Sequence, residues 1–313
     1  MSVALRRGVL PAALLLGSCS VVPPDAPRPV VVAPPVVADP APAPAPAPTP
    51  APPPVPTFSG PASFTYAGEL TQGGWIRGAV PGGTVSARLG DQALAIAPDG
   101  SFFAAFDRDA GPAAQLVATM ADGGQVIASF AVSPRAWQIE RVNVARSPGG
   151  ATADFMELRR PELARINAAR VAEAPSEGWR QAFIWPARGR ISGRFGSQRI
   201  YRGGEEGAYH SGLDIAGGAG TVYVAPADGV VTLAATTPFS LEGYLLIIDH
   251  GQGLNSAFLH SSELLVHEGD VVRQGQPLGR IGMTGRATGP HLHWSIKWRD
   301  ARLDPLLFLP PRP

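Results

Sequence analysis

Residues 289–296 read GPHLHWSI, and this short stretch decides how the rest of the chain is interpreted. Polar and apolar residues alternate along it, as they do in a strand that buries one face. Side chains two residues apart lie on the same face of a strand, so His291 and His293 share a face. The stretch therefore predicts a half-buried strand that presents two imidazole groups side by side.

A second motif, HSGLD at residues 210–214, has a related spacing. Residues four apart on a strand also share a face, so we expect His210 and Asp214 to converge. Imidazole nitrogen and carboxylate oxygen are ordinary zinc ligands, and a catalytic zinc typically keeps three protein ligands and leaves the fourth position for water. Two histidines and one aspartate would complete such a site. All six histidines lie at or after position 210, so the candidate chemistry is confined to the C-terminal part of the chain.

Around these motifs the chain resembles the M23 zinc metallopeptidases of the lysostaphin and LytM type, which cut the peptide part of bacterial cell walls. The resemblance runs from about Trp185 to about Pro305. It rests on GRISGRFG at 189–196, HSGLD at 210–214, APADG at 225–229, IDHG at 248–251, LH at 259–260 and GRATGPHLH at 285–293. It implies an antiparallel β structure with the metal in a groove, whereas periodicity alone indicates only an all-β domain.

The resemblance also implies a role for each histidine of these motifs. His210, Asp214 and His293 would bind one Zn²⁺ per chain, and His260 and His291 would stand beside the metal-bound water as its catalytic partners. The sequence does not distinguish which of the last two is the base. Many members carry a tyrosine where this chain has Phe258, a departure that bears on fine tuning of the site. We interpret the two remaining histidines, at positions 250 and 267, as structural and surface residues.

Other hydrolytic mechanisms find no support in the sequence. It contains no HExxH helix motif and no GxSxG nucleophile motif, and its single cysteine, Cys19, lies near the N-terminus. The family and the expected location favour a D,D-endopeptidase that cleaves D-alanyl to diaminopimelate cross-links of peptidoglycan. The alternative is a non-catalytic regulator that activates wall amidases, because some family members have lost metal ligands and act in this way. A third interpretation, a wall-binding structural lipoprotein, would leave the five signature residues unexplained.

The N-terminal residues indicate export and a lipid anchor. Residues 1–18 have two arginines, a short apolar run and then small residues, as a signal peptide does. LGSC at 16–19 resembles the lipobox of bacterial lipoproteins, in which the cysteine is acylated; the alternative is ordinary signal cleavage nearby. Several acyl chains would make the anchor stable. In lipoproteins of diderm bacteria an aspartate after the cysteine tends to retain the protein in the inner membrane, so by this resemblance Ser20 favours the outer membrane. We therefore expect a cell-envelope protein facing the periplasm.

The remaining chain divides into a linker, two β-rich parts and a helical connector. Residues 19–56 are rich in Pro and Ala and are expected to be extended. Residues 57–135 show short alternating runs, including 93–97, which predict a small β-sandwich. Residues 136–182 contain the expected helix, with Pro161 in its first turn, an apolar stripe of Leu163, Ile166 and Val171, and arginines on a solvated face. Residues 183–313 form the expected catalytic domain.

The composition limits the classes of partner. The formal net charge is +1, which argues against a nucleic-acid partner, for which a strongly basic patch is expected. A single cysteine excludes an intramolecular disulfide. Peptidoglycan cross-links and, through the anchor, a membrane are therefore the expected partners, and the sequence identifies no protein partner.

Overall fold

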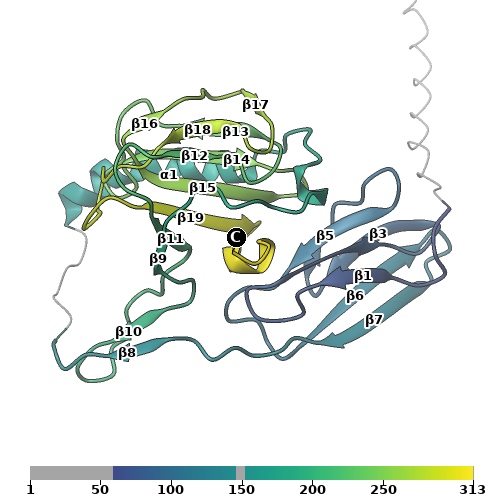
Figure 1. Ribbon diagram of the computed structural model, residues 1–313. Helices are drawn as coiled ribbons and strands as arrows, with labels where there is room; N and C mark the ends of the chain where they lie inside the picture. The colour runs from purple at the N-terminus through teal and green to yellow at the C-terminus, as the bar shows by residue number, and fades with distance from the viewer. Residues whose placement is uncertain (1–58, 146–151, 313) are drawn as a thin grey trace, which may run out of the picture. The chain divides into compact units, whose positions relative to one another are not determined.

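The computed structural model describes residues 59–145 and 152–312, and Figure 1 shows their strands and helices. These residues form mainly antiparallel sheets, with one α-helix and two short 3-10 helices. The predicted fold class, mostly β with one connecting helix, is therefore confirmed. The expected signal peptide, Cys19 and the Pro-rich linker lie outside the described residues. Within the described part of the chain, no helix has the length and apolar character needed to span a membrane.

Residues 65–131 form two antiparallel sheets. The first sheet has the order β1-β2-β5 and contains β1 (Thr65–Gly68), β2 (Trp75–Ala79) and β5 (Ser101–Ala105). The second sheet has the order β4-β3-β6-β7 and contains β3 (Thr84–Leu89), β4 (Gln92–Ala93), β6 (Ala113–Met120) and β7 (Gln125–Ala131). Phe102 and Phe103 of β5 and Leu116 of β6 are fully buried in one apolar core, so side chains from both sheets fill it.

The expected strand at 93–97 is wrong beyond Ala93. The Ala97 amide donates a hydrogen bond to the Ser101 carbonyl, and the Gly100 amide donates one to the Ala97 carbonyl. These two bonds close a turn that leads into β5. The Leu94 amide still donates to the Ala87 carbonyl of β3, but the backbone groups that follow it are used in the turn.

Helix α1 (Ala153–Val171) begins earlier than the sequence predicted. The Thr152 hydroxyl caps the first turn by accepting a hydrogen bond from the Phe155 amide at 3.2 Å. Pro161 therefore lies inside the helix and not in its first turn. The predicted apolar stripe is correct only at Ile166, because Leu163 and Val171 are exposed. The prediction that all the arginines are solvated is also wrong, since Arg159 is only 6% exposed.

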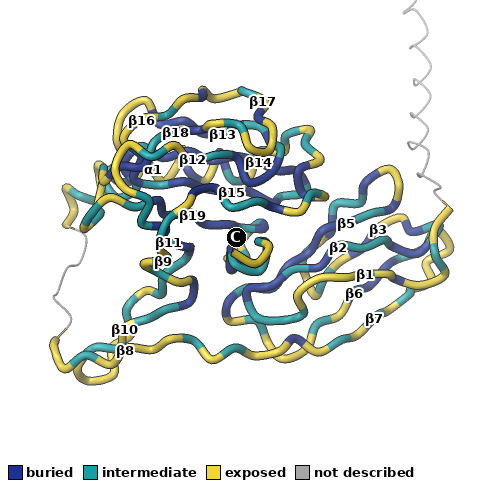
Figure 2. The backbone as a smooth tube through the Cα atoms, in the orientation of Figure 1, coloured by how far each residue is buried: buried dark blue, intermediate teal, exposed yellow. Residues whose placement is uncertain are grey.

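An eight-stranded antiparallel sheet forms the centre of the C-terminal half. Its order is β17-β13-β14-β15-β19-β11-β9, and β20 also pairs with β19. The strands are β9 (Arg190–Gly193), β11 (Leu213–Ala216), β13 (Gly229–Ala234), β14 (Tyr244–Asp249), β15 (Leu254–Ser261), β17 (Val271–Val272), β19 (Leu292–Trp298) and β20 (Ala301–Leu303). β15 and β19 are almost wholly buried, and Figure 2 shows the buried residues gathered along these central strands.

Two smaller sheets accompany the large one. β12 (Val222–Val224), β18 (Pro277–Arg280) and β16 (Glu263–Leu264) form a three-stranded sheet in the order β12-β18-β16. β8 (Ile139–Arg141) pairs in parallel with β10 (Gln198–Ile200). The short helices are η1 (Gly178–Arg180) and η2 (Pro305–Phe308). β8 comes from the segment that precedes α1, so this segment contributes a strand beside the C-terminal half.

A stack of aromatic rings joins the small sheet to the large one. Phe258 of β15 stacks on Tyr223 of β12 with ring centroids 5.4 Å apart, and on Trp294 of β19 at 6.5 Å. All three residues are fully buried. Burial of large apolar surface is the main favourable contribution to folding, and offset stacking adds to it. The stack therefore fixes the relative positions of the strands that lead to His260 and His293.

Candidate metal centre

Asp214 and His293 are brought together by strand register. β11 and β19 are antiparallel neighbours, and Asp214 is the register partner of His293. Directly opposed residues of antiparallel strands have their side chains on the same face of the sheet, about 5 Å apart at Cβ. The Asp214 Oδ1 atom lies 2.8 Å from His293 Nδ1. Two residues that are 79 positions apart in the chain therefore meet through sheet pairing.

His210 reaches this pair from a loop. It precedes β11, and its backbone is held by two hydrogen bonds: its amide donates to the Ser197 carbonyl and its carbonyl accepts from the Gly196 amide, each at 2.8 Å. Its Nε2 atom lies 3.0 Å from Asp214 Oδ1 and 3.1 Å from His293 Nδ1. The predicted convergence of His210 with Asp214 occurs, but the predicted reason is wrong, because His210 is not on a strand.

The three side chains form a group suited to a metal ion. Their donor atoms are two imidazole nitrogens and one carboxylate oxygen, and the pairwise separations are 2.8, 3.0 and 3.1 Å. Ligand atoms around a tetrahedral zinc with bonds of about 2.0 Å are about 3.3 Å apart. The donor set and its spacing therefore fit zinc.

Neighbouring backbone atoms orient these ligands. The Nδ1 atom of His210 lies 3.1 Å from the Arg194 carbonyl oxygen, which can only accept a hydrogen bond. Nδ1 therefore carries a proton, so Nε2 is the atom of this ring that would bind a metal. A Cβ at Gly193 would lie 2.3 Å from Asp214 Oδ2, and one at Gly212 would lie 2.7 Å from His293 Nε2. Glycine at both positions leaves room for the ligands.

Charge and burial set the protonation states of the group. Burial raises the pKa of Asp214, but the hydrogen bonds and positive charge of His210 and His293 outweigh it and hold this pKa well below its usual range. Burial lowers the pKa of His293, and its hydrogen bond to Asp214 offsets this only in part. Burial also acts to lower the pKa of His210, but its interactions with Asp214 raise it overall. An ionised Asp214 and a neutral His293 are the forms that bind metal.

His260 and His291 lie beside the three candidate ligands. The ring centroids of His260 and His291 are 5.0 Å apart, and His291 Nε2 is 3.8 Å from Asp214 Oδ1. His260 Nδ1 is hydrogen-bonded to the Thr284 carbonyl at 2.9 Å, and His291 Nδ1 to the Gly289 carbonyl at 2.8 Å. Each carbonyl can only accept, so the neutral form of each ring carries its proton on Nδ1 and has its acceptor at Nε2. The pKa of His260 is lowered, mainly by burial.

A family model described as peptidase family M23 matches residues 208–305. These residues form an M23 peptidase domain. Peptidoglycan DD-endopeptidase ShyA of Vibrio cholerae is 38% identical over 107 residues, which are 34% of this chain and 24% of that protein. Murein hydrolase activator NlpD of Escherichia coli is 35% identical over 140 residues, which are 44% of this chain and 33% of that protein. The chain thus spans only about a quarter to a third of the length of these relatives.

Solved structures also resemble this chain. A peptidase M23 from Pseudomonas aeruginosa has a TM-score of 0.58 and 27% sequence identity, and the match covers 77% of this chain and 95% of that one. The likeness therefore extends beyond the M23 domain into the residues before it. M23 peptidases are typically zinc-dependent, which agrees with the donor set described above.

The other two histidines of the M23 domain lie away from the ligand group. His250 is fully buried, with Nδ1 hydrogen-bonded to the Asp228 carbonyl at 2.7 Å and Nε2 to the Ser256 hydroxyl at 2.8 Å. Both ring nitrogens are therefore occupied within the core. The side chain of His267 is 91% exposed. Phe258 lies in the aromatic core, so a tyrosine hydroxyl at this position would enter packed apolar surroundings.

A groove of about 1210 Å³ is lined by the candidate metal ligands His210 and Asp214. Arg194 and Arg286 line it, and neither has an ion-pair partner among the described residues. Gln138 and Glu140, from the segment before α1, line it as well. None of these four residues was predicted to line the groove, although Arg194 and Arg286 lie inside two motifs of the sequence, GRISGRFG and GRATGPHLH. No sequence pattern placed Gln138 and Glu140 at the groove. They lie there because β8 pairs with β10, which is a tertiary contact.

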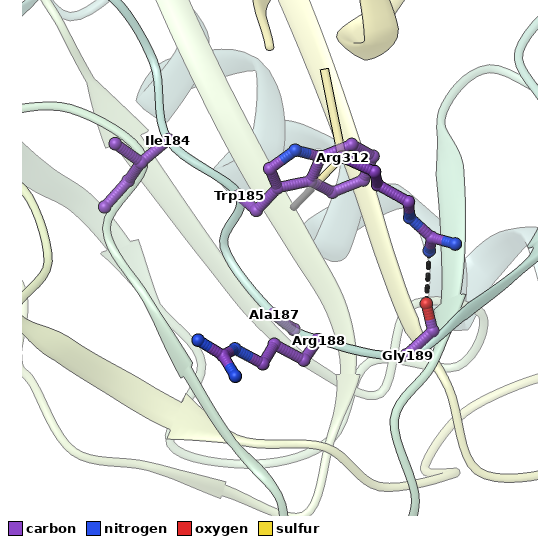
Figure 3. A pocket seen from close by; sticks show the side chains of 6 residues that line it. All are labelled: Ile184, Trp185, Ala187, Arg188, Gly189 and Arg312. Carbon is purple, nitrogen blue, oxygen red and sulfur yellow. Dashed lines mark hydrogen bonds between the residues drawn. The ribbon is translucent and has the colours of Figure 1, made fainter. Parts of the chain in front are cut away.

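A separate pocket of about 510 Å³ is lined by Ile184, Trp185, Ala187, Arg188, Gly189 and Arg312 (Figure 3). Arg312 lies over the Trp185 ring at 5.1 Å and also donates a hydrogen bond to the Gly189 carbonyl. Its lining residues include none of the metal-ligand candidates, so this pocket is distinct from the groove at the site.

Proposed function

We propose that this chain is a zinc-dependent peptidoglycan hydrolase that cleaves peptide cross-links, acting as a D,D-endopeptidase on the D-alanyl to diaminopimelate bond. The observation that carries the proposal is the mutual approach of three donor atoms, from His210, Asp214 and His293, within 3.1 Å of one another. Beside them stand two histidines whose Nε2 atoms are free to exchange protons. M23 membership and the likeness to a DD-endopeptidase support the same conclusion.

Under this proposal, three of the five site residues would bind zinc and the other two would handle protons. His210 Nε2, Asp214 Oδ1 and His293 Nδ1 would hold one Zn²⁺. When bound, zinc supplies Lewis-acid chemistry, lowering the pKa of a coordinated water and polarising the peptide carbonyl. His260 and His291 would act at Nε2, one accepting the proton of the attacking water and the other stabilising the oxyanion or protonating the leaving amine. The carbonyls of Thr284 and Gly289 keep the required tautomer.

The groove is suited to an acidic peptide. The stem peptides of peptidoglycan carry free carboxylates, and Arg194 and Arg286 line the groove without ion partners among the described residues. Guanidinium groups bind carboxylates through paired hydrogen bonds. A peptide lying in this groove would therefore place its carboxylates near the arginines and its scissile bond near the ligands.

We further propose that the protein works in the cell envelope. The relatives ShyA and NlpD are named for peptidoglycan and murein, which lie outside the cytoplasm. Acylation at Cys19 would tether the protein to a membrane, and the Pro-rich linker would let it reach the wall. An outer-membrane location facing the periplasm fits Ser20, which follows the anchor.

A second candidate function is activation of another cell-wall hydrolase. It is favoured by the likeness to NlpD, a murein hydrolase activator, which covers more of this chain than the likeness to ShyA. The retained set of five site residues favours catalysis, because activation by contact does not require three convergent metal ligands.

The two functions are separated by digestion of purified diaminopimelate-type peptidoglycan with the purified full-length chain. Muropeptides are measured by mass spectrometry with zinc and after chelation, and the variants are His210→Ala and, as control, the exposed His267→Ala. Catalysis predicts loss of cross-linked dimers that needs zinc and His210 but not His267. If the folded, zinc-loaded chain leaves the dimers intact but accelerates a purified amidase, the activator function replaces the proposal.

A further inference from the structure

We propose that Arg159 of helix α1 is a positioning residue for His260, acting through Glu242. The inference rests on the proposed function, in which His260 handles a proton. It adds a contribution from the connecting segment, because α1 ends well before residue 208, where the M23 family match begins.

The first link is a buried ion pair between the helix and a loop. Arg159 donates two hydrogen bonds to the Glu242 carboxylate, at 2.5 and 2.6 Å. It also donates one to Glu162, whose carboxylate accepts hydrogen bonds from the amide and hydroxyl of Ser240, both at 2.6 Å. The Arg159, Glu162 and Glu242 side chains are only 8, 12 and 16% exposed. α1 therefore holds the loop at two points, Ser240 and Glu242.

The second link runs from the loop to His260. The Glu242 carbonyl accepts the hydrogen bond of the His260 backbone amide at 2.8 Å. The next residue, Gly243, lies so close to Thr284 that a Cβ there would be 2.1 Å from the Thr284 hydroxyl oxygen. The carbonyl of Thr284 in turn accepts from His260 Nδ1. Both the backbone and the ring of His260 are thus held by groups that touch the loop.

The backbone of His260 needs this support. Its φ angle is 66°, in the left-handed region that residues with a Cβ rarely adopt. Such a conformation persists only where the surroundings impose it, and it is common where a side chain must be aimed at a reaction. The hydrogen bond to Glu242 and the bond to Thr284 are the restraints that impose it here.

Loss of Arg159 would disturb this arrangement in a definite way. The Glu242 carboxylate would remain buried without its partner, which is strongly unfavourable, so the loop would move to expose it to water. Movement of Glu242 would shift the carbonyl that holds the His260 amide. Zinc binding would be unaffected, because His210, Asp214 and His293 belong to other segments of the chain.

The test compares Arg159→Ala with Arg165→Ala in the full-length, zinc-loaded protein. Arg165 lies on the same helix and also pairs with a glutamate, Glu268 at 2.8 Å, but its pair is about half exposed. We expect Arg159→Ala to lower kcat on cross-linked muropeptides about 10- to 100-fold, with KM and zinc content unchanged. Arg165→Ala should match the wild type. Arg159→Lys should restore only part of kcat, since lysine lacks the bidentate geometry.

A second readout does not depend on activity. In NMR spectra of protein containing isotope-labelled histidine, the backbone amide resonance of His260 should shift in Arg159→Ala but not in Arg165→Ala. Hydrogen exchange of the same amide should accelerate only in Arg159→Ala. If Arg159→Ala does not fold, the triple change Arg159→Met, Glu162→Gln and Glu242→Leu removes both ion pairs of Arg159 without leaving a buried charge. That variant should show the same shift and the same fall in kcat.

The outcomes distinguish this inference from the proposed function. If the wild type cleaves nothing, the proposed hydrolase function is wrong. The resonance and hydrogen exchange of the His260 amide then test the positioning role of Arg159 without any activity. If the wild type is active but kcat and the His260 amide are the same in Arg159→Ala as in Arg165→Ala, the positioning role is refuted. A fall in kcat that follows zinc loss would refute it as well.

Discussion

Asp214 and His293 face each other across the pairing of β11 with β19, with Asp214 Oδ1 only 2.8 Å from His293 Nδ1. The same oxygen lies 3.0 Å from His210 Nε2, so one carboxylate oxygen contacts both imidazoles. This arrangement explains why the Asp214 pKa is so low: two hydrogen bonds stabilise its ionised form against the effect of burial.

Replacing Asp214 by Asn should remove the charge but preserve the shape of the side chain. We expect zinc affinity to fall more than about 100-fold, because loss of a direct ligand costs more than loss of an outer hydrogen-bond partner, which costs 10- to 100-fold. Zinc titration of the metal-free protein by calorimetry measures the change. His267→Asn, on an exposed side chain, serves as the control. Equal affinity in both variants would exclude Asp214 as a ligand.

Gly193→Ala should weaken the site without altering any ligand. The added Cβ would lie 2.3 Å from Asp214 Oδ2, so the carboxylate must turn away from the imidazoles. We expect zinc affinity to fall about 10- to 100-fold, as for other changes that misorient a ligand. The matched control is Gly111→Ala, where a Cβ meets nothing within 4 Å. Unchanged zinc affinity in Gly193→Ala would show that the carboxylate has room to move.

Stability should fall in mild acid because of His250. Burial lowers the pKa of this fully enclosed ring from 6.5 to about 4. Between these values the unfolded chain binds a proton that the folded protein excludes, so stability is full above pH 6.5 and decreases as the pH falls towards 4. The loss is about 3 kcal/mol over this range. Urea unfolding at a series of pH values measures it.

The control for this pH dependence is His250→Asn, which has no group that titrates in this range. It should be less stable at pH 7.5, since the bonds to Asp228 and Ser256 are disturbed, but its stability should change less between pH 6.5 and 4. Parallel pH profiles for the two proteins would assign the acid sensitivity to other groups.

Arg286→Ala should weaken substrate binding and leave the chemical step intact. An exposed ion pair contributes about 0.2–1 kcal/mol, so KM for carboxylate-bearing muropeptides should rise about 1.5- to 5-fold with kcat unchanged. The difference should shrink at high salt, because screening weakens exposed charge pairs. Arg88→Ala, an exposed arginine of β3, is the control. A fall in kcat at constant KM would contradict a binding role for Arg286.

Phe258→Ala should destabilise the M23 domain by about 3–5 kcal/mol, because it leaves a cavity in a fully packed aromatic stack.

Phe258→Tyr tests the departure from the family pattern. The ring is fully buried between Tyr223 and Trp294, so we expect its new hydroxyl to lower stability and not to raise kcat. Thermal unfolding and muropeptide kinetics measure the two effects. An increase in kcat in the tyrosine variant would place this position at the site.

The local patterns of the chain were sufficient to predict much of its secondary structure. Alternation in GPHLHWSI predicted a half-buried strand at 289–296, but β19 begins at Leu292, so His291 lies before it, and the strand is almost wholly buried because it pairs on both sides within the central sheet. The motif order predicted the M23 domain, which the family match confirms. The five site residues stay a prediction in their catalytic roles, although the structure brings them together. Sequence patterns succeed here because strand alternation and short motifs are local properties.

The helix shows where local patterns were insufficient. Arg159 looked like a solvated residue, because arginine is rarely buried unless it is paired. Its partner Glu242 lies 83 positions later, and no local pattern connects the two. The left-handed backbone conformation of His260 could not be predicted from local sequence either. The groups that impose it come from the loop at Glu242 and from Thr284.

The sequence by itself determined the residue types at the site, their order along the chain and the β character of both halves. Tertiary structure alone decided the register of Asp214 with His293, the approach of His210 from a loop, and the contribution of the connecting segment to the groove. The physical reason is that side-chain chemistry and strand alternation depend on neighbouring residues. Register, burial and ion pairing depend on segments that are far apart in the sequence and come into contact only in the folded protein.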